Sequence, residues 1–384
     1  MVVGEAAADY DRHPVLAELE RHPHARAVLA PALVAPPRPS HAYLFHGPGG
    51  SGKRAAARAL AAQLLSEGVH DPDGARRRAL AGAHPDLTWV QPSGAHEILV
   101  SDIDGPVIAA ASRTPFEARR RVFVVERADE LGDAAANMML KTLEEPAPFV
   151  HLILLSERPG EVLATIRSRC QSVRFEAPAE AEVAAELERE GLTAQTALAC
   201  VRLALGDTDR ARQLASAEGL SLRAAAEGAA RCALAGEIDV RRPWGEVMSA
   251  ARARGEAAEA RVEEAGRAEL ELTASRDRKR VQGEWSERAR RARRRAQTAA
   301  LDLGLQVVSL WYSDLAAIAH GAHELVRNQD RLAELAHDAG PAPARLLEAV
   351  ELVEETRERF TLNVSEELAC EALGLRLVRL LEAG

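Results

Sequence analysis

The chain has 384 residues, a formal net charge of −9, 47% hydrophobic residues and only 3% aromatic residues. This length allows two or three domains, and cores built from Ala, Leu and Val favour helices. The negative charge argues against a protein that coats nucleic acid non-specifically, although it is compatible with a local basic face. The sequence lacks a long apolar run and a signal peptide, so it predicts a cytoplasmic protein without membrane spans. Four scattered cysteines form neither a zinc motif nor a disulfide framework.

Residues 1–39 have a helical pattern followed by a proline-rich link at 36–39. A short apolar strand then leads into a glycine-rich loop and an alanine-rich helix over residues 55–65. This is the strand–loop–helix context of a P-loop, whose backbone N–H groups and helix N-terminus cradle phosphates. Arg54 stands where a Ser or Thr hydroxyl would hold Mg²⁺, so the site either binds nucleotide without efficient chemistry or is a relic. The candidate nucleotide-binding residues are Gly47, Gly49, Gly50, Gly52, Lys53 and Arg54.

Residues 68–82 are polar, with a turn predicted at 71–74. Strands are predicted at 84–90 and 97–100, and a helix at 103–112.

Residues 121–126 form a continuous apolar run that ends in a carboxylate, as in a strand buried on both faces of a parallel sheet. In P-loop ATPases, an Asp at this strand end orients the Mg²⁺ shell and a following Glu activates water. Here these Walker-B-like positions hold Glu126 and Arg127. A guanidinium cannot accept a proton at neutral pH, so the sequence predicts that general-base hydrolysis is lost.

A helix over 133–145 with Asp133 as its N-cap, a strand over 151–156 and a last strand over 172–175 complete the first domain. Alternating strands and helices predict a three-layer α/β sandwich that closes near Pro178. Two short motifs lie in this part, Leu-Glu-Glu-Pro at 143–146 and Ser-Arg-Cys at 168–170. Taken alone, the arginine of the second motif is more simply a solvated surface residue.

From residue 179 onward only helices are predicted: short ones to 218 and longer ones to 384. After the turn at Gly206, Arg210 or Arg212 can reach toward a phosphate, but a plain surface arginine is an equally good interpretation. Residues 246–300 are almost wholly Ala, Glu and Arg, which predicts a largely solvent-facing helix. The arginine run at 288–295 can contact DNA phosphates, but a solvated face with intrahelical Glu–Arg pairs is the favoured interpretation.

Together these motifs resemble the clamp-loader subunits of bacterial DNA polymerase III, which are AAA+ proteins, and among them the delta-prime group, relatives of gamma/tau. The stretches that carry the resemblance are residues 41–45, 84–87, 136–146, 166–170, 205–211, 311–315, 328–330 and 363–369. The resemblance implies a P-loop AAA+ three-layer sandwich over 1–178, a helical lid over 179–235, and a helical oligomerisation collar over 236–384.

In such a protein, Arg169 is a trans-acting arginine finger that serves ATP bound by the neighbouring subunit. Ser156 and Arg210 are sensor-like. The implied partners are the gamma/tau and delta subunits and, through the complex, the sliding clamp and primer-template DNA. ATP or ADP is expected to bind weakly or not at all. The family's four-cysteine zinc module has no counterpart in residues 66–82, so no zinc is expected. The alternatives are an ATP-hydrolysing gamma/tau-like subunit and a non-replicative AAA+ adaptor.

Overall fold

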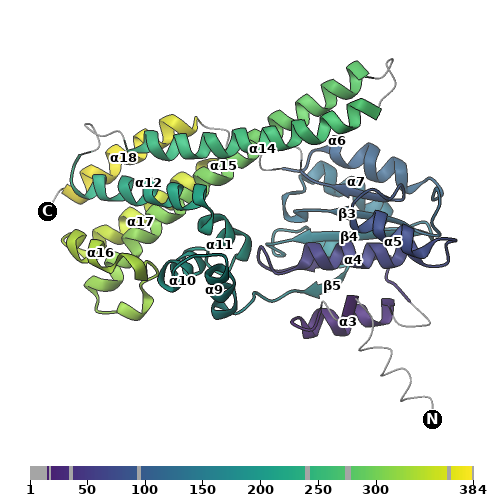
Figure 1. Cartoon of the computed structure of the whole chain (residues 1–384), viewed down its shortest axis with the longest axis horizontal. Coiled ribbons are helices and arrows are strands. Elements are labelled where there is room, and N and C mark those ends of the chain that lie inside the picture. The colour runs from purple at the N-terminus through teal and green to yellow at the C-terminus, as the bar shows by residue number, and fades with distance from the viewer. Residues whose placement is uncertain are drawn as a thin grey trace, which may run out of the picture. The chain divides into compact units, whose positions relative to one another are not determined.

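The computed structural model describes residues 15–16, 19–33, 38–92, 97–237, 243–272, 278–360 and 365–382. The chain divides into two compact units, Met1–Pro178 and Ala179–Gly384 (Figure 1). Residues 36–37 of the predicted proline-rich link and residues 363–364 of the motif at 363–369 lie outside the described residues. Within the described ranges, no helix combines the length and apolar character needed to cross a membrane.

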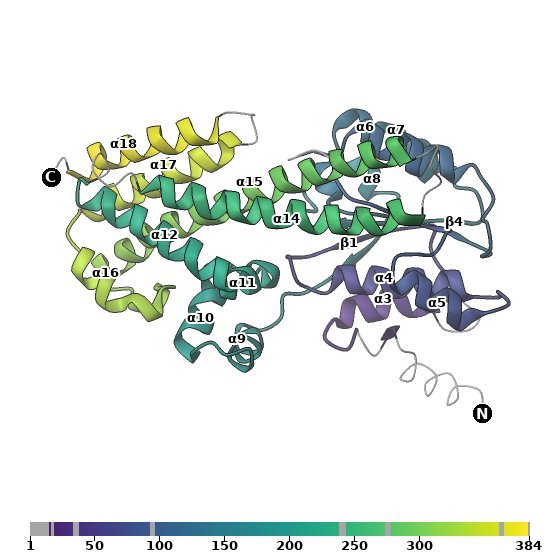
Figure 2. The same ribbon diagram turned by 45° about the horizontal axis from the view of Figure 1, so that its top comes forward.

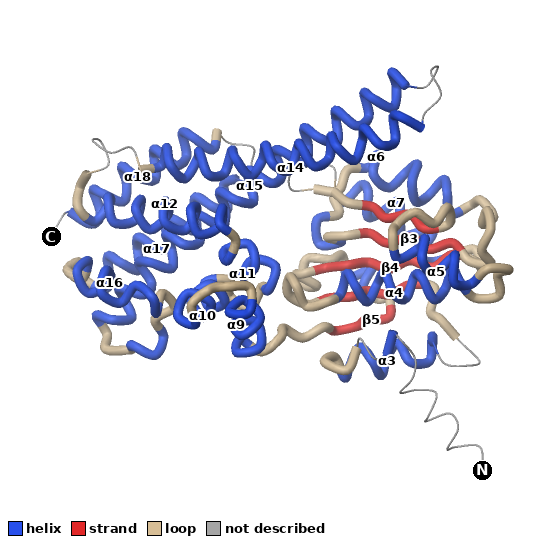
Figure 3. The backbone as a smooth tube through the Cα atoms, in the orientation of Figure 1, coloured by secondary structure: helices blue, strands red, loops and turns tan. Residues whose placement is uncertain are grey.

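The first unit is built on a five-stranded sheet in which every pairing is parallel. The strands are red in Figure 3. Its strands are β1 Ala42–His46, β2 Leu87–Val90, β3 Arg121–Val125, β4 Val150–Ser156 and β5 Gln171–Arg174. They are ordered β2-β3-β4-β1-β5, so β4 is central and all seven of its residues are buried. The register pairs His46 with Ser156, which brings the end of β4 next to the start of the glycine-rich loop.

Helices cover both faces of this sheet (Figure 2). α3 Pro23–Leu33, α4 Lys53–Ser66 and α5 Pro72–Leu80 pack on one face, against alternate strand residues such as Phe45 and Val124. α6 Val100–Ile103, α7 Asp133–Glu144 and α8 Ala164–Arg167 pack on the other, against Leu44 and Phe123. Because successive strand side chains point to opposite faces, one apolar run supplies both cores. The predicted three-layer α/β sandwich is confirmed.

Three local predictions in this unit were wrong. Residues 71–74 are not a free turn but the start of α5: Asp71 caps the helix by accepting from the Gly74 amide at 2.9 Å, and Pro72 is its first residue. Residues 97–100 are not a strand; Ile98 forms a single bridge with Leu131, and α6 begins at Val100 and continues as a π-helix to Ala109. The N-cap of α7 is Gly132, with Asp133 as its first helical residue.

The described residues of the second unit form helices and connecting loops, with no strand among them. Its helices are α9 Glu180–Arg189, α10 Ala194–Leu203, α11 Thr208–Ala215, α12 Ala217–Leu234, α14 Trp244–Leu272, α15 Arg278–Ala319, α16 Leu332–Asp338, α17 Pro343–Arg359 and α18 Glu366–Glu382. A single hydrophobic core runs from Val183 to Leu381 and includes the fully buried Trp311 and Tyr312. This core is shared by the segments predicted as lid (179–235) and collar (236–384).

The prediction of a single helix between residues 246 and 300 was wrong, although most described side chains of this region are exposed or half-buried, as predicted. This region contributes to two helices, α14 and α15, which pack along each other. Gly255 and Gly266 are buried in the seam, where an added Cβ on Gly266 would lie 2.9 Å from the Trp285 ring. Small residues therefore allow two highly charged helices to approach closely.

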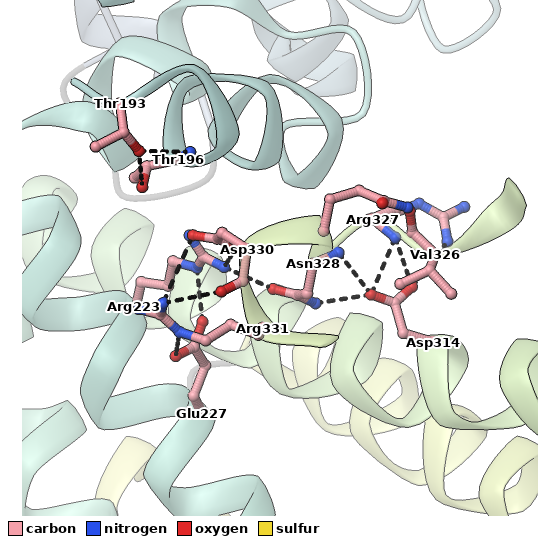
Figure 4. Close-up of polar contacts among 11 residues, drawn as sticks. Thr193, Thr196, Arg223, Glu227, Asp314, Val326, Arg327, Asn328, Asp330 and Arg331 are labelled. Atoms are coloured by element: carbon pink, nitrogen blue, oxygen red, sulfur yellow. Dashed lines mark hydrogen bonds and ion pairs between the residues drawn. The ribbon is translucent and has the colours of Figure 1, made fainter. Parts of the chain in front are cut away.

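A buried polar network fixes the loop between α15 and α16 (Figure 4). Arg223 of α12 is 1% exposed and donates to both carboxylate oxygens of Asp330, at 2.7 and 2.8 Å, and to the Asn328 amide oxygen at 2.9 Å. Its Nε lies 2.6 Å from a Glu227 carboxylate oxygen. Asp314 of α15 accepts from the Asn328 backbone amide at 2.8 Å. A buried guanidinium needs such partners to offset its desolvation, which gives the Asn-Gln-Asp motif at 328–330 a structural reason.

Candidate nucleotide site and arginine finger

The glycine-rich loop between β1 and α4 has a backbone that only glycine adopts easily. Gly47 has φ 151°, and a Cβ there would lie 2.2 Å from the Phe175 carbonyl oxygen. Gly52, which directly precedes α4, has φ 86°. This left-handed conformation is open to glycine at little cost. The loop therefore closes against β5 and delivers the N-terminus of a 14-residue helix to the end of the sheet, a position that favours anions.

Lys53 is the first residue of α4 and is 6% exposed. Its ammonium group donates to the carbonyl oxygens of Gly47 at 3.0 Å and Pro48 at 2.9 Å, and it lies 3.6 Å from the Glu157 carboxylate. Ser51 and Ser156 are each 1% exposed, and among the described residues their hydroxyls find no hydrogen-bond partner. These groups fit a phosphate. The N-terminus of α4 and the Lys53 ammonium group supply positive charge, and the two hydroxyls can donate hydrogen bonds to phosphate oxygens.

The metal position does not fit Mg²⁺. Arg54 forms an ion pair with one carboxylate oxygen of Glu126, which is 4% exposed at the end of β3. The other oxygen accepts from the Trp89 indole at 2.6 Å and from the Gln91 amide at 3.5 Å. A guanidinium thus neutralises the carboxylate that would orient the metal shell. No hydroxyl is available at position 54 to ligate the ion.

Arg127 is turned away from the site. It has φ 54° and ψ 50°, a left-handed conformation that is uncommon outside glycine, and its guanidinium pairs with the Glu130 carboxylate. The position from which a general base would activate water is therefore occupied by a cation that is already engaged with another carboxylate.

The Leu-Glu-Glu-Pro and Ser-Arg-Cys motifs meet in space. Arg169 follows α8 and donates to the Thr165 carbonyl at 2.9 Å and to the Glu144 carboxylate at 2.5 Å. The side chains of Arg169 and Glu144 are 35% and 49% exposed. Cys170 packs against the sheet core instead, and burial raises the pKa of its thiol to about 12. The cysteine therefore anchors the loop, while the arginine stays at the surface.

Of the remaining predicted residues, Ser156 lies beside the P-loop, because its carbonyl accepts from the Gly47 amide at 3.2 Å. Arg210 belongs to the second unit, on α11, where its guanidinium contacts Gln306 and lies 3.5 Å from Asp302, both on α15. Its sensor-like role stays a prediction.

Sequence reasoning missed Glu157 and His22 in the first unit's sites, and it noted the motif of Glu144 without its pairing to Arg169. Glu157 faces Lys53, and its position directly after β4 was the available signal. Glu144 holds Arg169 across 25 residues of sequence, and no local pattern marks that pairing. His22 packs edge-on to Phe175 with ring centroids 5.1 Å apart and accepts from the Glu176 amide at 3.3 Å. Burial lowers the pKa of His22, so its neutral form supports the loop next to Gly52.

Residues 27–179 match the protein family described as DNA polymerase III, delta subunit. The delta-prime subunit of Bacillus subtilis DNA polymerase III is 38% identical over 143 residues, which cover 36% of this chain and 43% of that protein. The gamma/tau subunit of Mycobacterium bovis is 33% identical over 171 residues, covering 41% of this chain and 28% of that protein. The solved structure of a Thermotoga maritima gamma subunit-related protein covers 88% of this chain and 94% of its own, at 14% identity.

The TM-score to that structure is 0.42. The chain spans less than half the length of the first curated relatives that it matches. The matched region is nearly the whole described part of the first unit, including the P-loop, Glu144 and Arg169. Residues 27–179 are therefore similar to the delta-prime subunits of DNA polymerase III, as the motifs of this region predicted.

Proposed function

We propose that the chain is the delta-prime subunit of a DNA polymerase III clamp loader, which helps to load the sliding clamp onto primed DNA. In this proposal, it assembles with gamma/tau and delta subunits and gives Arg169 to a neighbouring ATPase subunit. Residues 179–235 act as a lid, and residues 236–384 act as the oligomerisation collar. The match of the first unit to delta-prime subunits supports this assignment.

The observation that carries the proposal is the contrast between two arginines. Arg54 is committed to Glu126 at the position where catalysis would need a metal. Arg169 is held only by contacts at the surface, where its ion pair with Glu144 has both side chains at least one-third exposed. Exposed ion pairs contribute about 0–1 kcal/mol, so a phosphate on another chain can readily replace Glu144. The chain is thus suited to donate charge to another subunit's reaction and not to hydrolyse ATP itself.

The P-loop of this chain binds ATP or ADP weakly in this proposal. Lys53 and the N-terminus of α4 hold the phosphates, and Glu157 weakens the site because its carboxylate lies 3.6 Å from the same ammonium group. In the neighbouring subunit, bound ATP supplies the phosphoryl group that is transferred to water. Arg169 stabilises the negative charge on that group, as positioned guanidinium groups do in phosphoryl transfer.

The test is Arg169→Ala in the reconstituted loader, with phosphate release measured in the presence of primed DNA and the sliding clamp. Arginine fingers contribute about 10³-fold or more to the rate at the site they serve. The total rate of ATP hydrolysis should therefore fall by the fraction that the ATPase site served by Arg169 contributes. Gel filtration should still show the assembled ring.

Arg167→Ala is the matched control, because Arg167 lies two residues earlier and its guanidinium donates to the Pro159 carbonyl at 2.9 Å. Unchanged phosphate release from an assembled Arg169→Ala ring would remove the finger assignment.

The similarity to a gamma/tau subunit favours one alternative, an ATP-hydrolysing subunit of the same complex. A steady-state ATPase assay on the isolated chain separates the two. Measurable Mg²⁺-dependent turnover by the chain alone would favour the alternative, whereas none is expected with Arg54 paired to Glu126.

A further inference from the structure

The hairpin formed by α14 and α15 has a separate feature that the proposed function does not use. Near its base, Gly255 would bring a Cβ within 3.2 Å of the Arg293 and Gln297 side chains, and nearer its tip Gly266 faces Trp285. The two helices therefore run antiparallel in close contact. Their free end extends beyond the other helices of the second unit (Figure 2). Gly255 and Gly266 lie in this seam, and most of the described Arg and Glu side chains of the two helices are exposed.

Charge is divided between the two helices of the hairpin. Residues 278–297 of α15 contain nine Lys or Arg and two Glu, in a chain whose net charge is −9. Residues 244–272, which form α14, contain four Arg and seven Glu. Within α15, residues 288–295 include six arginines and no acidic residue. The basic character therefore lies on one helix of the hairpin.

Only part of this arginine run is neutralised by ion pairs. Arg293 crosses the seam to Glu259 at 3.1 Å and Glu256 at 3.5 Å. Arg290 pairs with Glu287 at 3.1 Å, and both side chains are more than half exposed.

Three exposed arginines follow each other at three-residue spacing: Arg288, Arg291 and Arg294. Arg288 stacks over the Trp285 ring, with its guanidinium carbon 4.9 Å from the ring centroid. Among the described side chains, no carboxylate pairs with Arg288 or Arg291. The predicted solvated face with Glu–Arg pairs therefore accounts for Arg290 but not for Arg288 or Arg291.

Like charges four residues apart destabilise a helix, so an anion bound along this run would relieve repulsion between its arginines. The stripe from Arg288 to Arg294 spans about 9 Å at 1.5 Å per residue. A nucleic-acid duplex carries about five phosphates over that length of axis, at one charge per 1.7 Å. Guanidinium groups bind phosphate oxygens through two parallel hydrogen bonds. We propose that this arginine stripe on α15 binds the phosphate backbone of a nucleic-acid duplex.

The proposed contact does not read base sequence. Base readout requires side chains that reach base edges, and between Arg288 and Arg294 the other residues are alanines and arginines. Trp285, the nearest aromatic residue, is half-buried in the seam beneath Arg288. Binding is therefore electrostatic, with a strong dependence on salt and none on sequence.

The test uses the full chain and two fluorescent 30-base-pair DNA duplexes of unrelated sequence, with binding measured by anisotropy across a salt series. The variant is Arg288→Gln, Arg291→Gln and Arg294→Gln together. The matched control is Arg252→Gln, Arg261→Gln and Arg267→Gln, which removes the same charge from exposed positions on α14. Circular dichroism checks that both proteins keep the helical content of the parent chain.

The stripe variant should lose about 2.7 from the slope of log K against log salt, at 0.9 per phosphate contact. When salt rises from about 50 to about 200 mM, the affinity of the parent chain for the duplex should fall by a factor that is about 40 times larger than the factor for the stripe variant. The control should keep the parent slope. Three results would each overturn the proposal. They are an equal loss of slope in the two variants, a preference for one duplex over the other, and no duplex binding by the parent chain. Competition by polyglutamate as strong as by unlabelled duplex would also overturn it, because that result would favour an acidic protein.

Discussion

Replacing Arg54 with threonine should convert the nucleotide site from metal-independent to metal-dependent. The substitution supplies the hydroxyl that Mg²⁺ needs and releases Glu126, whose side chain is 5% exposed. Glu126 keeps its hydrogen bonds from Trp89 and Gln91, and the lost partner is itself 60% exposed. The loss of the pair should therefore cost about 1 kcal/mol, between the values for surface and buried pairs.

Ligand binding should more than offset that cost. At a free Mg·ATP concentration of about 100 times Kd, binding stabilises the folded state by about 2.7 kcal/mol. For a unit of this size, that corresponds to a rise in melting temperature of about 5–10 °C. The parent chain should respond equally weakly to ATP with Mg²⁺ and to ATP with EDTA. Arg54→Thr should respond to ATP only when Mg²⁺ is present.

The assay is thermal unfolding followed by fluorescence, with isothermal calorimetry to measure Kd directly. Arg58→Thr is the control: Arg58 lies one turn later on α4 and donates to the Leu80 carbonyl at 3.1 Å. It stacks over the Trp89 ring at 4.9 Å, but no ion pair joins it to Glu126 among the described residues. The reasoning fails if the parent chain requires Mg²⁺ to bind ATP, or if Arg58→Thr gains the same metal dependence as Arg54→Thr.

Two further predictions concern stability. Burial lowers the pKa of His151, so below about pH 6.5 the unfolded chain binds more protons and the folded state is destabilised. His151→Gln should therefore lose less free energy of unfolding between pH 7 and 5 than the parent chain in urea titrations; an equal loss would contradict this. Asp330→Ala, which leaves Arg223 underpaired, should cost about 3–5 kcal/mol, whereas the exposed control Glu348→Ala should change stability by less than about 0.5 kcal/mol.

The sequence predicted those parts of the fold that local patterns determine. The apolar runs of β3 and β4 and the strand–loop–helix order around Lys53 were sufficient to predict the parallel sheet and its P-loop. Residues 71–74 were misassigned because Asp, Pro and Gly serve turns and helix N-termini alike. The backbone bond from the Ala75 amide to the Asp71 carbonyl at 3.1 Å, continued by the helix to Leu80, distinguishes the two.

The sequence identified the residues of the candidate sites, but it did not predict which of them form ion pairs with each other. Arg54 and Glu126 are 72 residues apart, and Glu144 and Arg169 are 25 apart. Each was noted for its own motif, and neither pairing follows from composition or spacing. The same holds in the second unit. The role of Gly255 and Gly266 depends on the packing of α15 against them, which the sequence does not show. The charged composition of residues 246–300 therefore predicted one helix, whereas the structure has two helices, α14 and α15, packed against each other.

The bonds from Lys53 to the carbonyl oxygens of Gly47 and Pro48 affect how mutants of this site are interpreted. Replacing a P-loop lysine is the customary way to ask whether a protein uses ATP. In this chain, the same ammonium group also ties the loop to its own helix. A loss of function in Lys53→Ala could therefore arise from reduced stability of the loop as well as from reduced nucleotide binding. Refolding curves are needed before any such phenotype is taken as proof of nucleotide use.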